Sequence, residues 1–387
     1  MKIAINVKSL MPGRGGGETY VLNLVKQLAA KGHDVHVFAN LYEPAGVPAT
    51  FHKVEAASAI KTFRDLAFAR NSRRMLEGQN FDVIFGTGKT PYVHVYRPGG
   101  GVHMEYVTRD AASAANPVGR KLRWLRRTLS VKECCNLILE RRTFQCPILK
   151  RVIVNSQMVN AHVLKWYDLP PERVLVAYNG VDLGRFSPAN REQFREAVRK
   201  EWKVGNELVI LFVANNFRLK GLRCLLQSLA TIKSKRSDPF KALIVGKGRT
   251  TFDAAYAARL GLAERVVFAG LTLEPERFYA AADILVHPTF HDPFANVCLE
   301  ALACGLPVIT TALNGASELI TNGGEGFVVP TPRDVDLLAD RIAYFFDPDA
   351  RAAASLAARR LAEKHPAEAN ADQLIRVFEE VSERVGG

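Results

Sequence analysis

Strand-like and helix-like segments alternate along this 387-residue chain in two successive series, and no other feature constrains the fold as much. In the first half, apolar runs of strand length cover residues 2–7, 35–38, 81–85, 151–155 and 174–178, and an amphipathic helix pattern covers 18–31. In the second half, strand-like runs at 208–214, 241–245, 266–269, 284–287 and 307–311 alternate with helix-like runs at 222–233, 252–260, 275–281 and 295–304. Such alternation predicts parallel sheets with helices on both faces. Because the chain is long enough for two domains of about 180 residues, we predict an α/β protein with two doubly wound domains.

Turn-forming residues indicate where one domain ends and the next begins. The segment Asn179-Gly180-Val181-Asp182 has the composition of a linker. It gives an N-terminal domain over residues 1–180 and a second domain over 181–366, and we expect a final helix in 367–387 to cross back onto the first domain. Ligands of open α/β sheets bind beyond the carboxyl ends of the strands, so two Rossmann-like domains are expected to aim their loops at a shared central cleft.

The composition is that of a globular protein, with 48% apolar and 24% charged residues. No uncharged apolar run reaches the roughly 18 residues that a spanning helix needs, and the N-terminal residues show no signal-peptide core. The six cysteines form no CxxC pair, which favours reduced, buried thiols. We therefore expect a cytoplasmic protein.

The net charge of +13 is concentrated in residues 120–151, where ten lysines and arginines face only Glu133 and Glu140, a net charge of +8. Apolar residues such as Trp124, Leu125 and Leu129 interleave with these cations. A cationic amphipathic segment of this kind can lie on an anionic membrane surface, which we predict as its partner. The alternative is a solvated helix face whose apolar side packs on the first domain.

Two other classes of protein fit parts of the pattern. A basic nucleic-acid-binding protein would explain the charge, but the charge is localised, aromatic residues are few and no RNA-binding fingerprint is present, so we expect no nucleic-acid partner. A nicotinamide oxidoreductase would use the glycine-rich segment Gly13–Gly17. However, Glu18 replaces the third glycine of the dinucleotide fingerprint, and Asn40 stands where an acidic residue is expected.

The same glycine-rich segment lies between the first strand and the first helix. The amides of Gly15, Gly16 and Gly17 can approach an anion at the start of that helix, where the helix dipole adds partial positive charge. A plain tight turn explains these glycines equally well.

Two cations follow the first strand of the second half. Arg218 and Lys220 precede Gly221 and the next predicted helix. Fixed cations at this point suit a diphosphate leaving group, which gains negative charge in the transition state. The alternative is a pair of solvated loop charges.

The segment from His287 to Val308 contains two acidic residues, Asp292 and Glu300, in an apolar setting. A carboxylate in so apolar a helix as that of Glu300 needs a partner, and ribose hydroxyls are suitable partners. The alternative for Glu300 is a surface position, and for Asp292 a helix N-cap with Pro293 as the first helical residue. Five residues after Asp292 are expected to help bind an anion through the start of the helix: Pro293, Phe294, Ala295, Asn296 and Val297.

Four motifs together resemble retaining GT-B glycosyltransferases of family 4. Asp292 and Glu300 match the E-x7-E region, residues 28–38 match an "LAxxGHxVxVF" motif after a glycine-rich loop, residues 179–188 match "NGVDxxxFxP", and Arg218 with Lys220-Gly221 match a basic pair. The resemblance implies that Glu300 holds the ribose of a nucleotide sugar, Asp292 the sugar hydroxyls, and Arg218 and Lys220 the diphosphate. Asp292 departs from the family's glutamate by one methylene group, which leaves the donor hexose open.

A narrower likeness is to glucosyltransferases of the lipopolysaccharide core. It rests on Asp82–Gly86 with Val95-Tyr96-Arg97, on the basic region that follows, and on Asp283–Pro288. It implies UDP-glucose as the favoured donor, with UDP-N-acetylglucosamine and GDP-mannose as alternatives, and a glycan or lipid-linked acceptor at the inner face of the cell membrane. The family implies a retaining, metal-independent hexosyltransferase.

His103 and Glu18 are candidates for the acceptor side of the reaction. His103 follows Gly99-Gly100-Gly101 in what we predict to be a glycine-rich loop, and it is a candidate catalytic residue or a structural loop histidine. The two closely spaced acidic pairs, Asp334 with Asp336 and Asp347 with Asp349, are explained by capping and turns. We therefore expect no metal and no cofactor other than the donor substrate.

Overall fold

The computed structural model describes residues 1–11, 15–44, 46–57 and 63–383. The chain forms two compact units, one of residues 1–179 together with the residues from Ala367 onwards, the other of Gly180–Pro366. The first unit is therefore built from two separate stretches of chain, because the last helix returns to it. Within the described residues, no helix is both long enough and apolar enough to cross a membrane.

The first unit contains a seven-stranded parallel sheet in the order β5-β3-β1-β6-β7-β8-β9. Its strands are β1 (Lys2–Asn6), β3 (Asp34–Ala39), β5 (Thr50–Lys53), β6 (Val83–Thr87), β7 (Val95–Arg97), β8 (Arg151–Val154) and β9 (Val174–Val176). A separate short pair joins β2 (Ser9–Leu10) to β4 (Leu41–Tyr42). The central strands are buried on both faces, as the continuous apolar runs of β1 and β6 predict.

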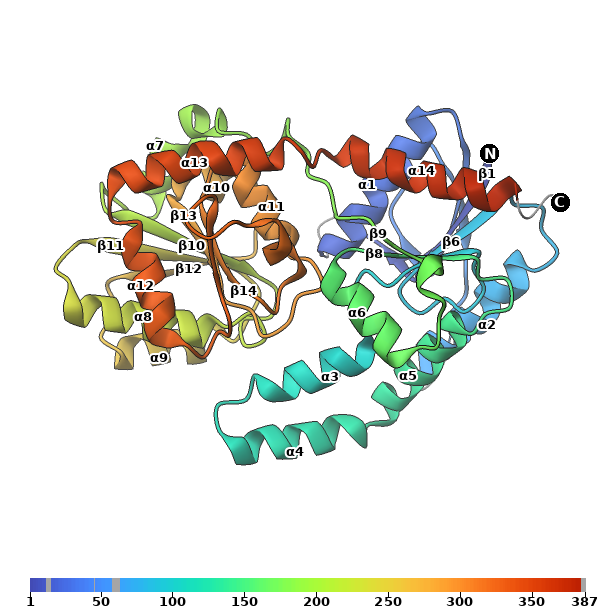
Figure 1. Cartoon of the computed structure of the whole chain (residues 1–387), viewed down its shortest axis with the longest axis horizontal. Helices are drawn as coiled ribbons and strands as arrows, with labels where there is room; N and C mark the ends of the chain where they lie inside the picture. The colour runs from blue at the N-terminus through green and yellow to red at the C-terminus, as the bar shows by residue number, and fades with distance from the viewer. Residues whose placement is uncertain (12–14, 45, 58–62, 384–387) are drawn as a thin grey trace. The chain divides into compact units, whose positions relative to one another are not determined.

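Helices cover both faces of this sheet (Figure 1). Helices α1 (Gly16–Ala30) and α14 (Ala367–Glu383) share one apolar core with the strands. Helices α2 (Arg64–Leu76), α5 (Val131–Phe144) and α6 (Gln157–Trp166) contribute to the core on the other face. Phe378 of α14 packs on Phe85 of β6 with ring centroids 5.3 Å apart, so the last helix is part of the first unit's core.

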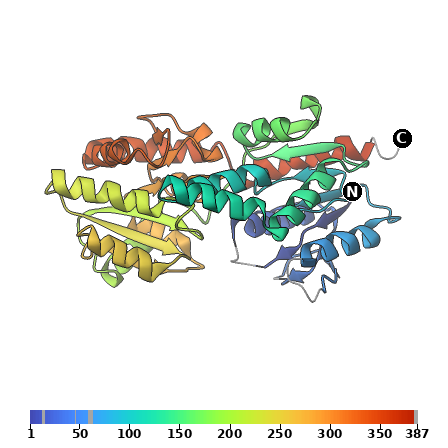
Figure 2. The same cartoon turned by 90° about the horizontal axis from the view of Figure 1, so that it is seen from below.

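Two further helices, α3 (His103–Ala112) and α4 (Pro117–Thr128), extend from the first unit as a side-by-side pair (Figures 1 and 2). Helix α4 has no buried residue. The basic stretch 120–151 thus spans most of α4, all of α5 and the start of β8. Its core residues come from α5 and from the segment that follows it, which contributes Cys146 and Leu149.

The second unit contains a six-stranded parallel sheet in the order β12-β11-β10-β13-β14-β15. Its strands are β10 (Leu208–Ala214), β11 (Phe240–Gly246), β12 (Val266–Gly270), β13 (Ile284–His287), β14 (Val308–Thr311) and β15 (Gly326–Val329). Helices α8 (Leu222–Lys235), α9 (Thr250–Arg259) and α12 (Val335–Tyr344) pack on one face and share its core. Helices α7 (Asn190–Glu201), α10 (Pro275–Ala281) and α11 (Asn296–Ala303) lie on the other face (Figure 1). Helix α13 (Pro348–Ala362) packs beside α11 and contributes Ala354 to the core.

Both units are therefore Rossmann-like, and the predicted α/β class is confirmed. Short 3₁₀ turns at Pro171–Arg173 and Gly315–Leu319 complete the described elements. All six cysteines have free thiols, and only that of Cys134 is exposed.

Candidate functional site

The strand order of the second unit marks one place where a ligand is expected. From β10 the chain builds outward through β11 and β12, and it then returns to the other side of β10 to add β13, β14 and β15. The loops that leave β10 and β13 therefore diverge, and such switch points are where open α/β sheets bind ligands. The loop after β10 carries Arg218 and Lys220, and the loop after β13 carries Asp292.

Backbone contacts join these two loops closely. The amide of Phe290 donates a hydrogen bond to the carbonyl oxygen of Leu219 over 2.8 Å. Gly221, the N-cap of α8, has a φ of +80°, and a Cβ atom there would lie 1.9 Å from the carbonyl oxygen of Pro288. Only glycine permits this approach, because any side chain would both strain the backbone and overlap the β13 loop.

Lys220 and Asp292 form an ion pair across the two loops. The Lys220 Nζ atom donates hydrogen bonds to Asp292 Oδ2 at 2.5 Å and to the carbonyl oxygen of His291 at 3.0 Å. Burial by itself raises the pKa of the Asp292 carboxyl, but the Lys220 ammonium and His287, whose Nε2 lies 3.5 Å from Oδ2, together hold that pKa well below its usual range. Asp292 is therefore a carboxylate at neutral pH.

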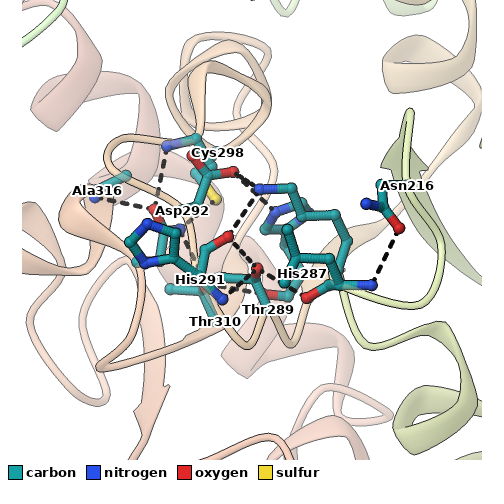
Figure 3. A network of polar contacts seen from close by, with 12 residues as sticks. Asn216, His287, Thr289, His291, Asp292, Cys298, Thr310 and Ala316 are labelled. Carbon is teal, nitrogen blue, oxygen red and sulfur yellow. Dashed lines mark hydrogen bonds and ion pairs between the residues drawn. The ribbon is translucent and has the colours of Figure 1, made fainter. Parts of the chain in front are cut away.

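Asn314 fixes the backbone beyond Asp292. Its partners Thr310 and Ala316 are labelled with Asp292 in Figure 3. Its Oδ1 accepts hydrogen bonds from the amides of Ala295 and Ala316, at 3.0 and 3.1 Å, and its Nδ2 donates to the Thr310 hydroxyl at 3.0 Å. The amide of Asp292 itself pairs with the carbonyl oxygen of Leu313 in an isolated parallel bridge.

This arrangement corrects two expectations. Asp292 is not a helix N-cap, because α11 begins at Asn296 with Ala295 as its N-cap and the Asp292 carboxylate is held by Lys220 instead. The Ala295 amide is not available to an anion, because Asn314 already accepts its hydrogen, and Pro293 has no amide hydrogen. Phe294, Asn296 and Val297 lie in the same segment, at the start of α11.

Glu300 lies half-buried on α11, with a partner that the sequence did not reveal. The hydroxyl of Tyr279, on α10, donates a hydrogen bond to Glu300 Oε2 at 2.8 Å. Burial raises the pKa of the Glu300 carboxyl, and this hydrogen bond partly offsets the rise. No described residue donates a hydrogen bond to Oε1.

Arg218 and the glycine-rich loop complete the predicted donor-side residues. Arg218 is half-buried in the turn between β10 and α8. Gly13 and Arg14 lie outside the described residues, whereas Gly15 is the N-cap of α1, and Gly16 and Gly17 begin the helix. Gly15 has an extended φ of 167°, and a Cβ atom at Gly15 or Gly17 would meet no atom within 4 Å. The surrounding structure therefore does not require glycine at these two positions.

His103 is not in a loop, contrary to the prediction. It is the first residue of α3, because Gly101, with a φ of +73°, closes the preceding turn and the Glu140 carboxylate accepts the His103 amide hydrogen at 2.9 Å. Its ring is nearly buried between Glu133, 2.8 Å from Nε2, and the Lys89 ammonium, 3.3 Å from Nδ1. Burial and Lys89 lower the pKa of His103 to about 4, so the ring is neutral at pH 7 with both nitrogens engaged.

The remaining acidic candidates have local roles. Glu18, in the first turn of α1, accepts a hydrogen bond from the Ser9 hydroxyl. Asp334 and Asp347 are the N-caps of α12 and α13, and their side chains accept hydrogen bonds from the amides of Leu337 and Asp349. Within the described part of the chain, no three His, Cys, Asp or Glu side chains gather in a way that could hold a metal ion.

The α4 surface consists of exposed apolar and basic side chains. Val118, Leu122, Trp124, Leu125 and Leu129 are exposed, by 45% in Trp124 and by more in the others. Lys121 and Arg126 are exposed beside them, whereas Arg123 and Arg127 turn inward to the buried Asp110 carboxylate, at 2.8 and 3.0 Å. The apolar side of α4 is therefore not packed on the first unit, which contradicts the solvated-helix alternative.

Family models match both units. The model described as "Glycosyltransferase Family 4" matches residues 14–185, and the model described as "Glycosyl transferases group 1" matches residues 207–347, so that together they cover most of the chain. The chain belongs to the family 4, group 1 glycosyltransferases. Lys220, Asp292 and Glu300 all lie within the residues that the second model matches.

Several relatives are similar over much of their length. The D-inositol 3-phosphate glycosyltransferase of Thermobispora bispora is 31% identical over 249 residues, which cover 62% of this chain but only 58% of that protein. The lipopolysaccharide glucosyltransferase WaaG of Escherichia coli K12 is 24% identical, and the match covers 82% of each chain.

Solved structures show the same fold. A crystal structure of WaaG aligns with a TM-score of 0.81 at 23% identity and covers 97% of this chain and 99% of that chain. Anabaena HepE in complex with UDP-glucose aligns with a TM-score of 0.73 at 19% identity, covering 98% of this chain and all of that chain. The fold is that of GT-B glycosyltransferases, as predicted.

Proposed function

We propose that this chain is a retaining, metal-independent hexosyltransferase. It moves a hexose, with UDP-glucose the favoured donor, to a hydroxyl group of a glycan or lipid-linked acceptor of the lipopolysaccharide core or a related cell-surface polysaccharide. The observation that carries the proposal is the Lys220–Asp292 ion pair at the switch point of the second sheet, with Glu300 on the helix that follows Asp292. The names of the similar proteins WaaG and HepE support a glucosyl donor.

In the proposed reaction, the bond between the anomeric carbon and the diphosphate oxygen breaks while the acceptor oxygen bonds to the same face of that carbon. The leaving diphosphate oxygen takes the proton of the acceptor hydroxyl. Negative charge therefore builds up on the diphosphate, and Lys220 and Arg218 stabilise it from the loop after β10. The Asp292 carboxylate accepts hydrogen bonds from the sugar hydroxyls.

Glu300 binds the ribose in this proposal. Tyr279 holds one carboxylate oxygen, and Oε1 accepts from a ribose hydroxyl. A hydrogen bond to a charged acceptor contributes about 1.5–3 kcal/mol, so its loss lowers the donor's affinity by one to two orders of magnitude.

The acceptor side is assigned to the first unit. His103 contributes a neutral ring there, whereas the amides of Gly15, Gly16 and Gly17 at the start of α1 are proposed to approach an anionic group of the donor. The α4 surface fits the anionic inner face of the cell membrane, where a lipid-linked acceptor would lie.

The first test measures release of UDP or GDP from UDP-glucose, UDP-galactose, UDP-N-acetylglucosamine and GDP-mannose, with and without a lipopolysaccharide-core extract and with and without EDTA. The variants are Glu300→Ala and, as the matched control, Glu264→Ala, which removes an exposed glutamate of the same unit. We expect acceptor-stimulated release from one donor, unaffected by EDTA, lost in Glu300→Ala and retained in Glu264→Ala.

Each contrary result removes a different part of the proposal. Unchanged turnover in Glu300→Ala removes the ribose assignment, and loss of turnover in EDTA that added metal restores removes metal independence. A protein that neither turns over nor binds any sugar nucleotide is not a transferase of this class.

A further inference from the structure

A cavity lies in the same unit, at the opposite end of the strands from the proposed donor site. It has a volume of about 470 Å³ and is lined by residues of α7, the start of β10, the residue before β13 and α13. The lining residues include four arginines: Arg191, Arg195, Arg199 and Arg351. Because Leu208 begins β10 and Asp283 precedes β13, the cavity adjoins the amino ends of these strands, whereas donors bind at their carboxyl ends.

Part of this arginine cluster has a structural role. Arg195 and Arg199 donate to the carbonyl oxygens at the end of α10 and to the two oxygens of Asp283, at 2.7 and 2.9 Å. These bonds satisfy the last carbonyls of the helix and favour its dipole. They also occupy the Asp283 carboxylate, which accepts hydrogen bonds from both arginines and from the amide of Val209.

The other two arginines keep donors available. Arg191 gives one hydrogen bond, from Nη2 to the carbonyl oxygen of Ala282 at 3.3 Å, and Arg351 uses only Nη1, toward the carbonyl oxygens of Phe345 and Phe346. No described residue accepts from Nε or Nη1 of Arg191, or from Nε or Nη2 of Arg351. Burial and the neighbouring Arg195 lower the pKa of Arg191, against the opposing effect of the nearby Asp283 carboxylate.

We propose that this cavity binds a small phosphate-bearing anion through the planar donor edges of Arg191 and Arg351. Guanidinium groups match phosphate oxygens with two parallel hydrogen bonds, and a cavity of this size holds a phosphate or a phosphomonoester. Glu192 and Glu196 line the cavity with exposed carboxylates, which would repel a long polyanion such as a nucleic acid and so favour a compact ligand. The site is separate from the donor site and does not depend on the proposed activity.

The test measures binding of radiolabelled inorganic phosphate to the full chain by equilibrium dialysis at low, constant ionic strength. Competition by sulfate and by glucose 1-phosphate distinguishes a simple dianion site from one that prefers a phosphomonoester. The variants are Arg191→Gln and Arg351→Gln, with Arg360→Gln as the control, because Arg360 is exposed on the same helix as Arg351. Lys220→Gln reports any phosphate bound at the donor loops.

We expect wild type, Arg360→Gln and Lys220→Gln to bind phosphate with a dissociation constant on the order of 1 mM or below, and Arg191→Gln and Arg351→Gln to bind about tenfold more weakly. Arg191→Lys keeps the charge but loses the paired donors, so its affinity for phosphate should lie between that of wild type and that of Arg191→Gln. An unchanged thermal unfolding midpoint shows that a variant is folded. Absence of phosphate binding to wild type, or binding lost in Lys220→Gln but retained in both arginine variants, overturns the proposal.

Discussion

The Lys220 ammonium and the Asp292 carboxylate lie 2.5 Å apart, on the two loops that diverge at the switch point of the second sheet. In the proposed donor site, the pair supplies a cation to the diphosphate and, from the next loop, an anion to the sugar hydroxyls. Lys220 and His287 hold the pKa of the Asp292 carboxyl low against the effect of burial, so Asp292 stays charged. A substitution at either residue therefore affects both.

Lys220→Gln should lower turnover of the sugar nucleotide about a hundredfold, because removing one preorganised charge stabiliser typically costs about 2.7–4 kcal/mol in the transition state. Binding of UDP should weaken less than turnover does. Steady-state kinetics and UDP titration measure the two effects, with Lys235→Gln, an exposed lysine at the end of α8, as the control. Equal losses in both variants would mean that Lys220 has no special role.

Tyr279→Phe should raise the KM for the donor about fivefold with little change in kcat, because Glu300 loses one hydrogen bond of about 1 kcal/mol. That hydrogen bond also lowers the pKa of Glu300, which burial raises. Without it the carboxyl protonates at a higher pH, so the KM of the variant should rise more steeply than that of wild type as the pH falls. A pH series of KM values checks this, and parallel curves would contradict it.

Gly221→Ala should destabilise the second unit strongly. Its φ of +80° alone costs about 1–2 kcal/mol for a residue with a Cβ atom, and the overlap with Pro288 adds to this. Gly32→Ala is a matched control, because Gly32 has a φ of +79° and a Cβ atom there would meet nothing within 4 Å. Urea unfolding should show a larger loss at Gly221 than at Gly32. Similar losses would mean that the β13 loop yields to the added methyl group.

The stability of the first unit should fall as the pH drops below neutral. His103 has a pKa of about 4 in the folded state against 6.5 in the unfolded chain. Its contribution to the free energy of unfolding is therefore complete above about pH 6.5. That contribution is lost progressively between pH 6.5 and 4, up to about 3 kcal/mol. His103→Gln cannot take up the proton and should flatten this dependence. Urea midpoints measured across the range test it. If the stability of the variant depends on pH as steeply as that of wild type, groups other than His103 control the pH dependence.

Replacing Leu122 and Leu125 of the α4 surface by serine should reduce binding to anionic vesicles, because both side chains are exposed by 47% or more. Co-sedimentation with phosphatidylglycerol vesicles measures binding, and phosphatidylcholine vesicles and added salt show the part due to charge. The same change at Leu271 and Leu273, which are exposed by 62% and 70% in the second unit, is the control. Equal loss in both double variants would argue against a specific membrane surface.

The sequence predicted the central strands of both sheets well, because β1, β10, β11 and β13 are buried runs of Ile, Val and Leu whose length leaves little choice of structure. It did not show β5, where Phe51 is the only apolar residue of four, or the bounds of helices α3 to α5, because these three helices follow one another with no strand between them. The position of His103 depended on Glu140, a capping group 37 residues away that no local pattern reveals.

The candidate site was predictable in its charges but not in its partners. Arg218, Lys220, Asp292 and Glu300 stand out as charges at strand ends or within an apolar helix. Tyr279 and Asn314 do not stand out, because their roles come from contacts with residues 21 and 19 positions away. An uncharged polar residue just after a buried strand, as Asn314 follows β14, was the available signal.

Helix α14 determines the order in which the two units can fold while the chain is being synthesised. The second unit is one continuous stretch, so it can fold as soon as residue 366 has left the ribosome. The first unit, although made earlier, must wait for Leu374, Phe378 and Val381 to fill its core. Until then, the apolar groove beside α1 and β6 stays open on the nascent chain, where a chaperone or a neighbouring chain can reach it.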